Sequence, residues 1–387
     1  MRILVAAERL GRAGGMERYV EIVLEALVAR GTTVHVLARE IDAVPPGVTA
    51  ERVPWADEHD APSFGARSAA LSALAAFAPD VAVAHNVMDA GIAEALRGAP
   101  RFAYHVHDHR PFCPNGDRVF PRSARICTQP LGRPCAVHSL TDGCGYGPRR
   151  RTLTLIRRRE RLRNAIASAD TVVVASRYVA DRAAQSAIPP GNIVEIPPPL
   201  PDDAYAAGAA HGDARTIVFA GRVVPQKGLD SLVRAVASIA PKRRPRLRAF
   251  GDGPALAEVR AEAVRLGVTL DAPGASSTAA VRAGIDRAAL AVLPSRWAEP
   301  FGYAGIEAFA RERTAVAFDV GGVRAWLDDG TNGIAVRAGD ERALGEAINE
   351  LLHDAARRAR LAHRARQDAE RFRAGSVAEA LLSAYRG

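Results

Sequence analysis

The sequence predicts an α/β protein built from two doubly wound domains that face a central cleft. Short apolar runs alternate with amphipathic stretches in both halves of the chain, as in parallel sheets that helices cover on both faces. A proline-rich segment between the halves is the one convincing linker. The length of 387 residues suits two domains of about 150–200 residues, each able to bury a core.

The first half starts with an apolar run at residues 3–7, which predicts a buried strand. Gly14 and Gly15 predict a turn after this strand, and Gly31 predicts the end of the helix that follows. A helix over residues 16–29 is predicted because its apolar side chains recur at helical spacing, at Met16, Tyr19, Val20, Val23, Leu24 and Leu27. Further apolar runs predict strands of the same sheet at residues 33–38, 81–84, 102–106 and 171–175.

The pattern restarts after the linker, whose core is Pro-Pro-Pro-Leu-Pro. Apolar runs predict the strands of a second sheet at residues 216–220, 246–250, 288–293 and 314–318. These boundaries give a first domain of residues 1–196, a linker of residues 197–213, a second domain of residues 214–365 and a terminal helical segment of residues 366–387. Because ligands bind at the carboxyl ends of parallel strands, we expect those ends to line the cleft.

The composition is typical of an ordinary soluble globular protein, with 48% apolar and 25% charged residues. No run of about 18 apolar residues predicts a membrane span. The first apolar run is too short, and too soon followed by Glu8, for a signal peptide, so we expect a cytoplasmic protein. Aromatic residues make up 5% of the chain. No nucleic-acid-binding motif accompanies the net charge of +9, so no nucleic-acid partner is expected.

Two glutamates eight residues apart, Glu299 and Glu307, are the most informative feature of the chain. Pro300 suits a first helical position, which predicts Glu299 just outside a helix N-terminus and Glu307 about two turns inside the helix. Backbone N–H groups at Phe301 and Gly302 would then be open to a phosphate or sugar oxygen. A solvated helix face and the acid–nucleophile pair of a glycosidase are the alternative interpretations.

A glycine turn with two cations follows the predicted strand at residues 216–220. Gly221 lets the chain turn tightly, and Arg222 and Lys227 follow where a diphosphate would rest against the next helix N-terminus. Lys227 is one of only two lysines among 52 basic residues. This rarity indicates that a compact ammonium is required there, with chance retention as the alternative. A second glycine turn, after the strand at residues 246–250, contains Gly251, Asp252 and Gly253.

Together these motifs resemble the signature of glycosyltransferase family 4 (glycosyl transferases group 1), retaining enzymes of the GT-B fold. The match runs from residue 216 to about residue 333 and contains the Gly-Arg-x4-Lys-Gly turn, the Gly-Asp-Gly turn and the Glu-x7-Glu pair. The resemblance implies an enzyme that moves a hexose-type sugar from a UDP- or GDP-linked donor to an acceptor with retention of configuration. It also implies an acceptor-binding first domain, a nucleotide-sugar-binding second domain and a last helix that crosses back onto the first. A non-catalytic protein of the same fold, which binds a sugar nucleotide or a polymer, is the alternative.

The resemblance also implies a role for each matching residue. Glu307 binds the ribose hydroxyls, and Glu299 contacts the transferred sugar. Arg222 and Lys227 neutralise the leaving diphosphate, so no divalent metal or other cofactor is required, and the sequence has no Asp-x-Asp motif. His107 matches the family's histidine near the sugar and completes the catalytic set. The donor-binding residues are Gly14, Gly15, Gly221, Arg222, Lys227, Gly251, Asp252, Gly253, Ser295, Glu299, Phe301, Gly302 and Glu307.

The first domain offers weaker features than the second. Its glycine run at residues 11–15 lacks the G-x-G-x-x-G fingerprint, so a nicotinamide enzyme is a poor second interpretation. The resemblance makes Gly14 and Gly15 the glycine loop that faces the donor phosphate. A single histidine at a strand end is usually a structural hydrogen-bonding group. The run Tyr-His-Val-His-Asp-His at residues 104–109 supports a functional role and a structural role for His107 equally.

All four cysteines, Cys113, Cys127, Cys135 and Cys144, lie in one 32-residue loop of the first domain. A loop rich in Pro, Gly and Arg has little core of its own. Free thiols, a structural zinc site with the cysteines or the nearby His138, and a disulfide are the three interpretations. The C-x2-C spacing of common zinc sites is absent, and the cytoplasm disfavours a disulfide.

A strongly basic stretch runs from Arg97 to Arg163, with 15 arginines and four acidic residues. Leu153, Ile156 and Leu162 share a predicted helix with several of these arginines. This pattern allows an amphipathic helix in peripheral contact with an anionic membrane, at the inner face of the cell membrane. A solvated basic face is the alternative. The acceptor stays open between a glycan, a lipid-linked molecule and a small molecule, with a role in glycan or cell-envelope biosynthesis.

Overall fold

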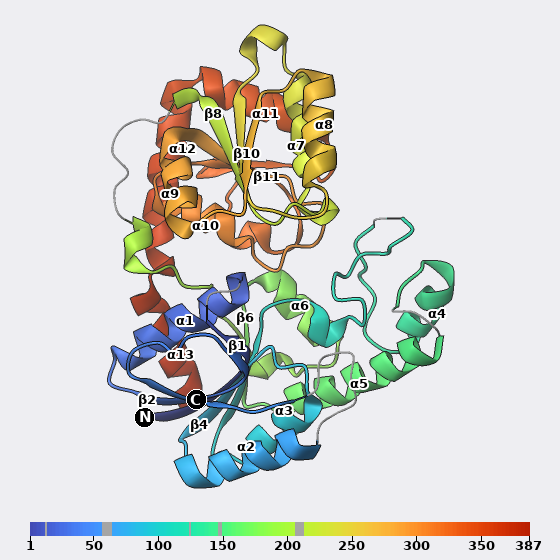
Figure 1. Ribbon diagram of the computed structural model, residues 1–387, viewed down its shortest axis with the longest axis vertical. Coiled ribbons are helices and arrows are strands. Elements are labelled where there is room, and N and C mark those ends of the chain that lie inside the picture. Colours follow the sequence, from blue (N-terminus) through green and yellow to red (C-terminus); the bar gives the residue numbers. More distant parts are fainter. Residues whose placement is uncertain (12–13, 56–63, 124, 146–148, 206–212) are drawn as a thin grey trace. The chain divides into compact units, whose positions relative to one another are not determined.

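The computed structural model describes residues 1–11, 14–55, 64–123, 125–145, 149–205 and 213–387 (Figure 1). The chain divides into two compact units. Unit 1 comprises residues 1–199 together with residues 374–387, and unit 2 comprises residues 200–373. Each unit carries its own parallel sheet with flanking helices. The predicted α/β class with two doubly wound domains is therefore confirmed.

Unit 1 is built on a parallel sheet that has seven strands within the described residues, in the order β3-β2-β1-β4-β5-β6-β7. The strands are β1 (Arg2–Leu10), β2 (Thr33–Ile41), β3 (Val48–Arg52), β4 (Val81–His85), β5 (Phe102–Val106), β6 (Thr171–Val174) and β7 (Ile193–Glu195). Every residue of β4, β5 and β6 is buried, as expected of central parallel strands, and their apolar runs were readable in the sequence. The edge strands β3 and β7 contain no fully buried residue and carry polar residues, so apolar patterning did not predict them.

Helices cover both faces of this sheet. They are α1 (Gly15–Val28), α2 (Phe64–Phe77), α3 (Ala90–Leu96), α4 (Arg133–Thr141), α5 (Arg149–Ala167), α6 (Arg177–Gln185) and α13 (Ala374–Arg386). Successive residues of β1 point to opposite faces. Ile3 and Val5 pack in a core with α1 and α13, whereas Leu4 and Ala6 pack in a second core with α2, α3, α5 and α6. Two apolar layers therefore hold the sheet between them.

Unit 2 has a parallel sheet with six strands, counted over the described residues, in the order β10-β9-β8-β11-β12-β13. The strands are β8 (Asp213–Ala220), β9 (Arg246–Phe250), β10 (Leu270–Gly274), β11 (Ala288–Leu293), β12 (Ala315–Phe318) and β13 (Gly333–Val336). The helices are α7 (Leu229–Ser238), α8 (Leu256–Leu266), α9 (Thr278–Arg287), α10 (Tyr303–Ala310), α11 (Glu341–His353) and α12 (Ala355–Asp368). Short 3₁₀ turns in the two units are η1 (Arg110–Phe112), η2 (Pro190–Asn192), η3 (Asp202–Tyr205), η4 (Pro225–Lys227), η5 (Pro241–Arg243), η6 (Gly321–Ala325) and η7 (Ala369–Phe372).

The helix after β11 begins later than predicted. α10 starts at Tyr303 instead of Pro300, and Gly302 occupies its N-cap in a left-handed conformation with φ of 96°. The carbonyl of Phe301 accepts a hydrogen bond of 2.6 Å from the indole N–H of Trp326. Trp326 belongs to a loop that is distant in the sequence. Because the carbonyl of Phe301 bonds to this indole and not to a backbone N–H of the helix, the helix begins after Phe301.

The chain crosses from unit 1 to unit 2 at residue 200 and returns at residue 374. Leu200 forms a parallel bridge with Arg373, and its N–H donates to the carbonyl of Phe372 at 2.6 Å, so the two crossing segments lie side by side. The returning helix α13 packs against α1 (Figure 1). The terminal segment was predicted as residues 366–387, but unit 2 extends to Arg373, which pairs with Leu200, and so includes the end of α12 and η7. Of the predicted linker, residues 206–212 lie outside the described residues, and β8 already begins at Asp213.

Along the described residues, no helix combines the length and the apolar character that a membrane span needs. α5 was predicted to offer an apolar face to a membrane. Ile156 and Leu162 are instead 6% and 0% exposed, and Leu162 packs in the core that α5 shares with α3. Only Leu153 of that face is exposed. The predicted membrane-facing apolar side is wrong, because unit 1 uses it to complete its own core.

Candidate functional site

Two loops of unit 2 meet where the order of the sheet reverses, between β8 and β11. The N–H of Arg296, after β11, donates to the carbonyl of Gln226, after β8, at 2.8 Å, and its guanidinium donates to the carbonyl of Pro225. Gly228 has a φ of 70°, and a Cβ at this position would lie 2.0 Å from the carbonyl oxygen of Pro294. Only glycine allows the two loops to approach so closely. Ligands of doubly wound sheets bind at this reversal point.

An ion pair joins these two loops. The Nζ atom of Lys227 lies 2.6 Å from Oε1 of Glu299, and the hydroxyl of Ser295 donates to the same oxygen at 2.5 Å. The ammonium also lies 5.3 Å from the centre of the Trp297 ring. Glu299 is 4% exposed. Burial alone would raise the pKa of its carboxyl group, but the charge of Lys227 and the hydrogen bonds from Lys227, Ser295 and Trp297 lower the pKa below its usual value. Glu299 is therefore an ionised carboxylate at neutral pH.

The two glycine turns pack against each other. A Cβ on Gly251, whose φ is 129°, would lie 1.9 Å from the carbonyl oxygen of Gly221. A Cβ on Gly253 would lie 2.3 Å from the carbonyl oxygen of Val223, whose own N–H donates to the carbonyl of Asp252 at 2.8 Å. The resemblance counted Gly221, Gly251 and Gly253 among the donor-binding residues. The structure shows that close packing of backbone on backbone already requires Gly251 and Gly253.

The other predicted donor-binding residues of unit 2 lie in the segments that follow β8, β9 and β11 and on α10. Arg222 is exposed, and within the described residues its guanidinium has no ion-pair partner. Phe301 is 5% exposed and lies just before Gly302, the N-cap of α10. Glu307 is 9% exposed and lies about one turn inside α10, because the helix begins later than predicted.

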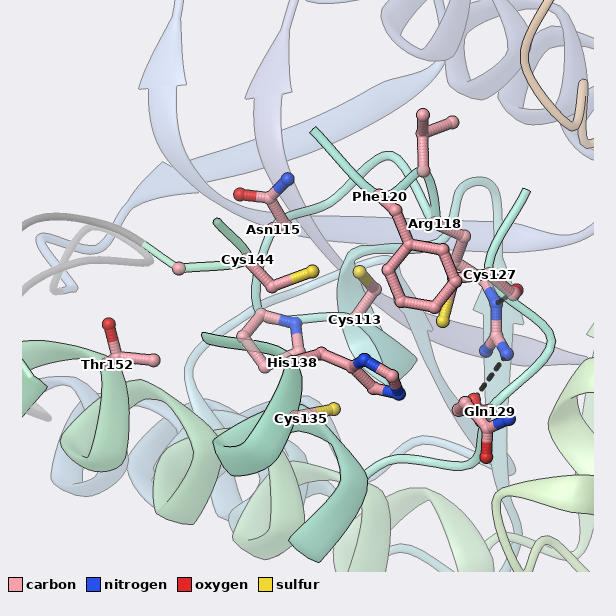
Figure 2. A pocket seen from close by; sticks show the side chains of 13 residues that line it. Cys113, Asn115, Arg118, Phe120, Cys127, Gln129, Cys135, His138, Cys144 and Thr152 are labelled. Atoms are coloured by element: carbon pink, nitrogen blue, oxygen red, sulfur yellow. Dashed lines mark hydrogen bonds between the residues drawn. The ribbon is translucent and has the colours of Figure 1, made fainter. Parts of the chain in front are cut away.

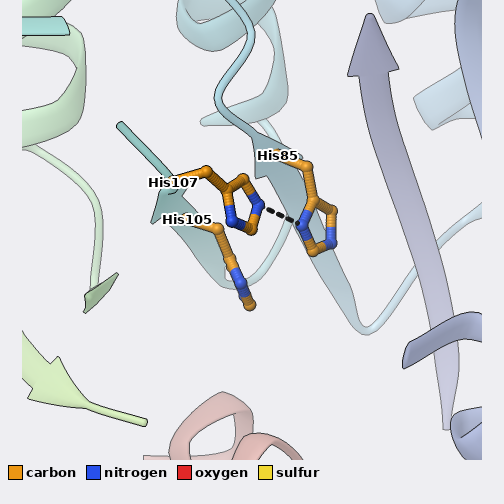
Figure 3. Close-up of side chains that lie close together, drawn as sticks. All are labelled: His85, His105 and His107. Atoms are coloured by element: carbon orange, nitrogen blue, oxygen red, sulfur yellow. Dashed lines mark hydrogen bonds between the residues drawn. The ribbon is translucent and has the colours of Figure 1, made fainter. Parts of the chain in front are cut away.

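Unit 1 gathers three histidines beside the reversal of its own sheet between β1 and β4 (Figure 3). His85 is the last residue of β4, and its Nδ1 lies 3.0 Å from Nε2 of His107, the residue after β5, with the two rings stacked. His105 contacts the hydroxyl of Tyr19 through Nδ1 at 3.2 Å and the hydroxyl of Tyr385 through Nε2 at 2.7 Å. Tyr385 belongs to α13, so the returning helix is bonded to β5.

Burial keeps these three imidazoles neutral. It lowers the pKa of His85 and of His105 well below the usual range, helped by the neighbouring histidines. Burial and the charge of Arg110 lower the pKa of His107 to about 3. His107 therefore cannot supply a proton as an imidazolium near neutral pH, although it can hydrogen-bond a substrate as a neutral ring.

The three histidines place one ring nitrogen each within 4.8 Å of one another, as in a metal site. Both ring nitrogens of His105 already contact tyrosine hydroxyls. A metal would displace one of these contacts, so the geometry describes a hydrogen-bonded network better than a set of free ligands. The sequence singled out only His107. A signal for His85 was present, because it directly ends an apolar run in the way that His107 does.

Glu8 is a further polar residue that the sequence interpretation missed. Its carboxylate accepts hydrogen bonds from the N–H of Met88 at 3.0 Å and from the indole of Trp55 at 3.2 Å, and Arg39 lies 3.5 Å away. Burial raises the pKa of Glu8. A charged residue directly after the apolar run of the first strand was the available signal.

Gly14 and Gly15 begin α1, with Gly14 as the N-cap in an extended conformation. Both are exposed, and nothing lies within 4 Å of a Cβ placed on Gly15. Residues 12–13 of the same loop lie outside the described residues. That this loop faces a donor phosphate stays a prediction.

Cys113, Cys127, Cys135 and Cys144 line one small cavity of unit 1 together with His138 (Figure 2). All four are free thiols, so no disulfide links them. The loop therefore brings together four side chains that are up to 31 residues apart in sequence.

Two family models match the chain one after the other. The model described as Glycosyltransferase Family 4 matches residues 13–204. The model described as Glycosyl transferases group 1 matches residues 204–368, which include both loops of the ion-pair site. The two matches meet close to the point where the chain passes from unit 1 to unit 2.

Curated relatives and a solved structure are similar to this chain. The D-inositol 3-phosphate glycosyltransferase of Stackebrandtia nassauensis is 35% identical over 235 residues, which cover 56% of this chain and 52% of the relative. The alpha-D-kanosaminyltransferase of Streptomyces kanamyceticus is 30% identical over 180 residues, 45% of this chain and 46% of the relative. The chain thus spans about half the length of the curated relatives it matches. The crystal structure of Anabaena HepE in complex with UDP matches with a TM-score of 0.73 at 19% identity over 99% of both chains, which shows a shared fold.

Proposed function

Because this chain belongs to glycosyltransferase family 4, we propose that it transfers a hexose-type sugar from a nucleotide-sugar donor to a hydroxyl group of an acceptor. We propose further that the transfer retains the anomeric configuration and needs no metal ion or other cofactor. The observation that carries the proposal is the ion pair of Lys227 with Glu299 at the reversal point of the unit 2 sheet.

The charges of this site suit departure of a nucleoside diphosphate. Breaking the bond between the sugar and the diphosphate leaves negative charge on the phosphate oxygens, and cations fixed beside those oxygens lower the barrier. Lys227 is held in place by Glu299, and Arg222 is exposed on the same loop. In this proposal the two side chains supply the positive charge that a divalent metal supplies in other transferases.

The acidic residues suit the two sugars of the donor. Glu299 is an ionised carboxylate and can only accept hydrogen bonds, so we assign it to hydroxyl groups of the transferred sugar. We assign Glu307 to the ribose hydroxyls and the N-terminus of α10, at Phe301 and Gly302, to donor oxygens. On the acceptor side we assign His107 as a neutral hydrogen-bonding partner of the sugar, and Gly14 and Gly15 as backbone donors to phosphate.

Chemical arguments narrow the range of donor bases and acceptors to be tested. A UDP-linked hexose is the first donor to test, since the structurally similar HepE is described in complex with UDP, and a GDP-linked hexose is the second. An anionic acceptor, either a phosphorylated small molecule or a lipid-linked phosphate, suits the exposed arginines between Arg97 and Arg163, among them Arg150, Arg151 and Arg157.

A donor screen tests the proposal. The melting temperature of the purified protein is measured with UDP-, GDP- and ADP-sugars in the presence of EDTA, and release of nucleoside diphosphate is then measured with the stabilising donor. Metal-free release by the wild type and its loss in Glu299→Gln support the enzyme. A strict requirement for Mg²⁺ would overturn metal independence. Tight donor binding with no release on any acceptor would favour the non-catalytic alternative.

A further inference from the structure

The cavity between the four cysteines is the strongest unassigned feature of the molecule. Cys113, Cys127, Cys135 and Cys144 are all the cysteines of the chain, and each contributes to the lining of this one cavity of about 30 Å³ (Figure 2). A volume of this size holds one or two water-sized particles. A random distribution would not place every thiol of a 387-residue chain around one such space.

Ionised thiols that line one cavity of this size would repel one another. Four thiolates could not share this space without a counter-charge, whereas a divalent cation bound at its centre would stabilise all four.

A buried cation beside the same cavity points to a negatively charged occupant. The side chain of Arg118 lines the cavity and is 1% exposed. Its Nε and Nη2 donate to the carbonyls of Cys127 and Gln129 at 3.3 and 2.7 Å, while Nη1 has no hydrogen-bond partner among the described residues. Leaving a buried guanidinium without a nearby anion is costly. A metal ion with four thiolate ligands carries a net charge of −2 and would supply that anion.

The loop buries Phe112, Phe120 and Leu131, but its helix α4 is not held by a hydrophobic core. No residue of α4 is buried, and its apolar residues Val137 and Leu140 are 56% and 51% exposed. The chain near Arg118 doubles back in a short antiparallel bridge of Val119 with Ile126, closed by a hydrogen bond of 2.6 Å between the Cys127 N–H and the Arg118 carbonyl. Small segments of this kind gain much of their stability from a metal.

We propose that Cys113, Cys127, Cys135 and Cys144 bind one Zn²⁺ ion as four thiolate ligands in tetrahedral geometry. Each thiol loses its proton to solvent, so that one Zn²⁺ and four thiols give one complex of charge −2 and four protons. The ion links distant parts of the loop between β5 and α5 to one another. It is structural and takes no part in the sugar transfer proposed above, which rests on residues of unit 2.

Metal binding requires the sulfur atoms to move inward. Within the described residues only the three histidines place three candidate ligand atoms within 4.8 Å of one another, so the thiols are more widely spaced. A tetrahedral site needs each sulfur at about 2.3 Å from zinc. Three of the cysteines lie outside any helix or strand, so rotation of side chains and small loop shifts provide this movement.

His138 lines the same cavity, with its Nδ1 held by the carboxylate of Asp142 at 2.8 Å, and is the competing ligand. We assign four thiolates because a three-thiolate site with His138 would leave one cysteine and half of the charge opposite Arg118 unused. The variant His138→Ala separates the two assignments.

The test measures metal content and spectra of the full-length protein. We expect about one equivalent of zinc per chain after purification under reducing conditions. Cobalt exchanged for the zinc should show sulfur-to-cobalt charge-transfer bands and the strong visible bands of a tetrahedral thiolate site. Each single Cys→Ser variant should lose at least about four-fifths of the zinc or change the cobalt spectrum. His138→Ala and Ser139→Ala, on the same helix, should retain the metal.

Variants that fail to fold do not weaken this test, because the wild type answers it directly. Chelation under mild denaturation should make all four thiols reactive toward a thiol reagent, and returned zinc should protect them again. Absence of stoichiometric metal, with no thiolate bands after addition of cobalt, would overturn the proposal. So would a native mass short of two hydrogens per disulfide, or the iron and visible absorption of an iron–sulfur cluster. Loss of zinc in His138→Ala would overturn the assignment of four thiolates.

Discussion

The ammonium of Lys227 lies 2.6 Å from the carboxylate of Glu299, although 72 residues separate them in the chain. Neighbouring strands β8 and β11 make this contact possible because the loops that follow them meet at one edge of the sheet. One side chain of the pair therefore fixes the other. Most of our predictions for the donor site follow from this contact.

Removal of the ammonium should slow the reaction. We expect Lys227→Ala to lower kcat by roughly 10²–10³, as loss of one charge-stabilising group does elsewhere. Lys242→Ala is the matched control, since Lys242 is the other lysine of the chain and is exposed in η5. Steady-state kinetics with a saturating donor measure the effect. Unchanged turnover in a folded Lys227→Ala variant would remove Lys227 from the mechanism.

The same pair should contribute to stability in a pH-dependent way. The folded-state pKa of Glu299 is lowered, so its stabilisation is present above the unfolded pKa and is lost as the pH falls through the folded pKa. Lys227→Met leaves a buried carboxylate without its partner, and we expect a loss of about 1–3 kcal/mol in the free energy of unfolding at pH 7. Urea denaturation should show the loss shrinking at acidic pH. The double variant Lys227→Met/Glu299→Gln should recover part of it, and a single variant as stable as the wild type would contradict the prediction.

Glu307 should matter for binding more than for turnover. The ribose of the donor changes little during reaction, so we expect Glu307→Ala chiefly to weaken the affinity for donor and for free nucleoside diphosphate. Isothermal titration calorimetry with the nucleoside diphosphate measures this affinity. Glu312→Ala, an exposed position just after α10, serves as the control. Intact nucleotide affinity in Glu307→Ala would mean that Glu307 only packs the helix.

The histidine cluster of unit 1, in which His85 and His105 are buried and His107 is partly buried, should make the protein sensitive to mild acid. Burial lowers the folded-state pKa of His85, His105 and His107 below the unfolded value of about 6.5, so the unfolded chain binds more protons in this range. Stability is therefore full above about pH 6.5 and falls as the pH drops toward the folded pKa values. Urea denaturation between pH 7.5 and 5 should show this slope. The variant His85→Gln/His107→Gln should flatten it, while His353→Gln, in α11, should not. A titration of His107 near pH 6.5 by NMR would contradict the prediction.

The exposed arginines of α5 should decide whether the protein meets an anionic membrane. Arg150, Arg151 and Arg157 are exposed, whereas Arg161 is already held by Glu94 at 2.6 Å. If the protein docks peripherally on a cytoplasmic membrane face, its binding to anionic vesicles should fall steeply with salt and weaken by about 1 kcal/mol for each exposed Arg replaced by Gln.

A control with the same loss of charge separates local docking from net charge. The variant Lys242→Gln/Arg243→Gln/Arg360→Gln removes three exposed cations of unit 2 and should bind vesicles as the wild type does. No vesicle binding at low ionic strength would favour a soluble anionic acceptor.

The sequence by itself determined the elements whose signal is local. Central strands such as β4, β5 and β11 are continuous apolar runs because parallel strands are buried on both faces. The glycine turns and the role of Lys227 could be predicted from the sequence, because only a few residue types adopt such turn conformations or carry a positive charge. The partnership of Lys227 with Glu299 was not readable, since it depends on which strands are neighbours.

Tertiary structure decided whatever depends on a distant partner. The indole N–H of Trp326 donates a hydrogen bond to the carbonyl of Phe301, so α10 begins at Tyr303 and not at Pro300. The apolar side of α5 packs in the core of unit 1. The local periodicity of the sequence could not distinguish such a side from a membrane-binding face. His85 and His107 come from different strands and meet only because β4 pairs with β5. The sequence gives the chemical type of each side chain. The burial, the pKa and the contacts of that side chain depend on other residues, which are distant in the sequence and become neighbours only when the chain folds.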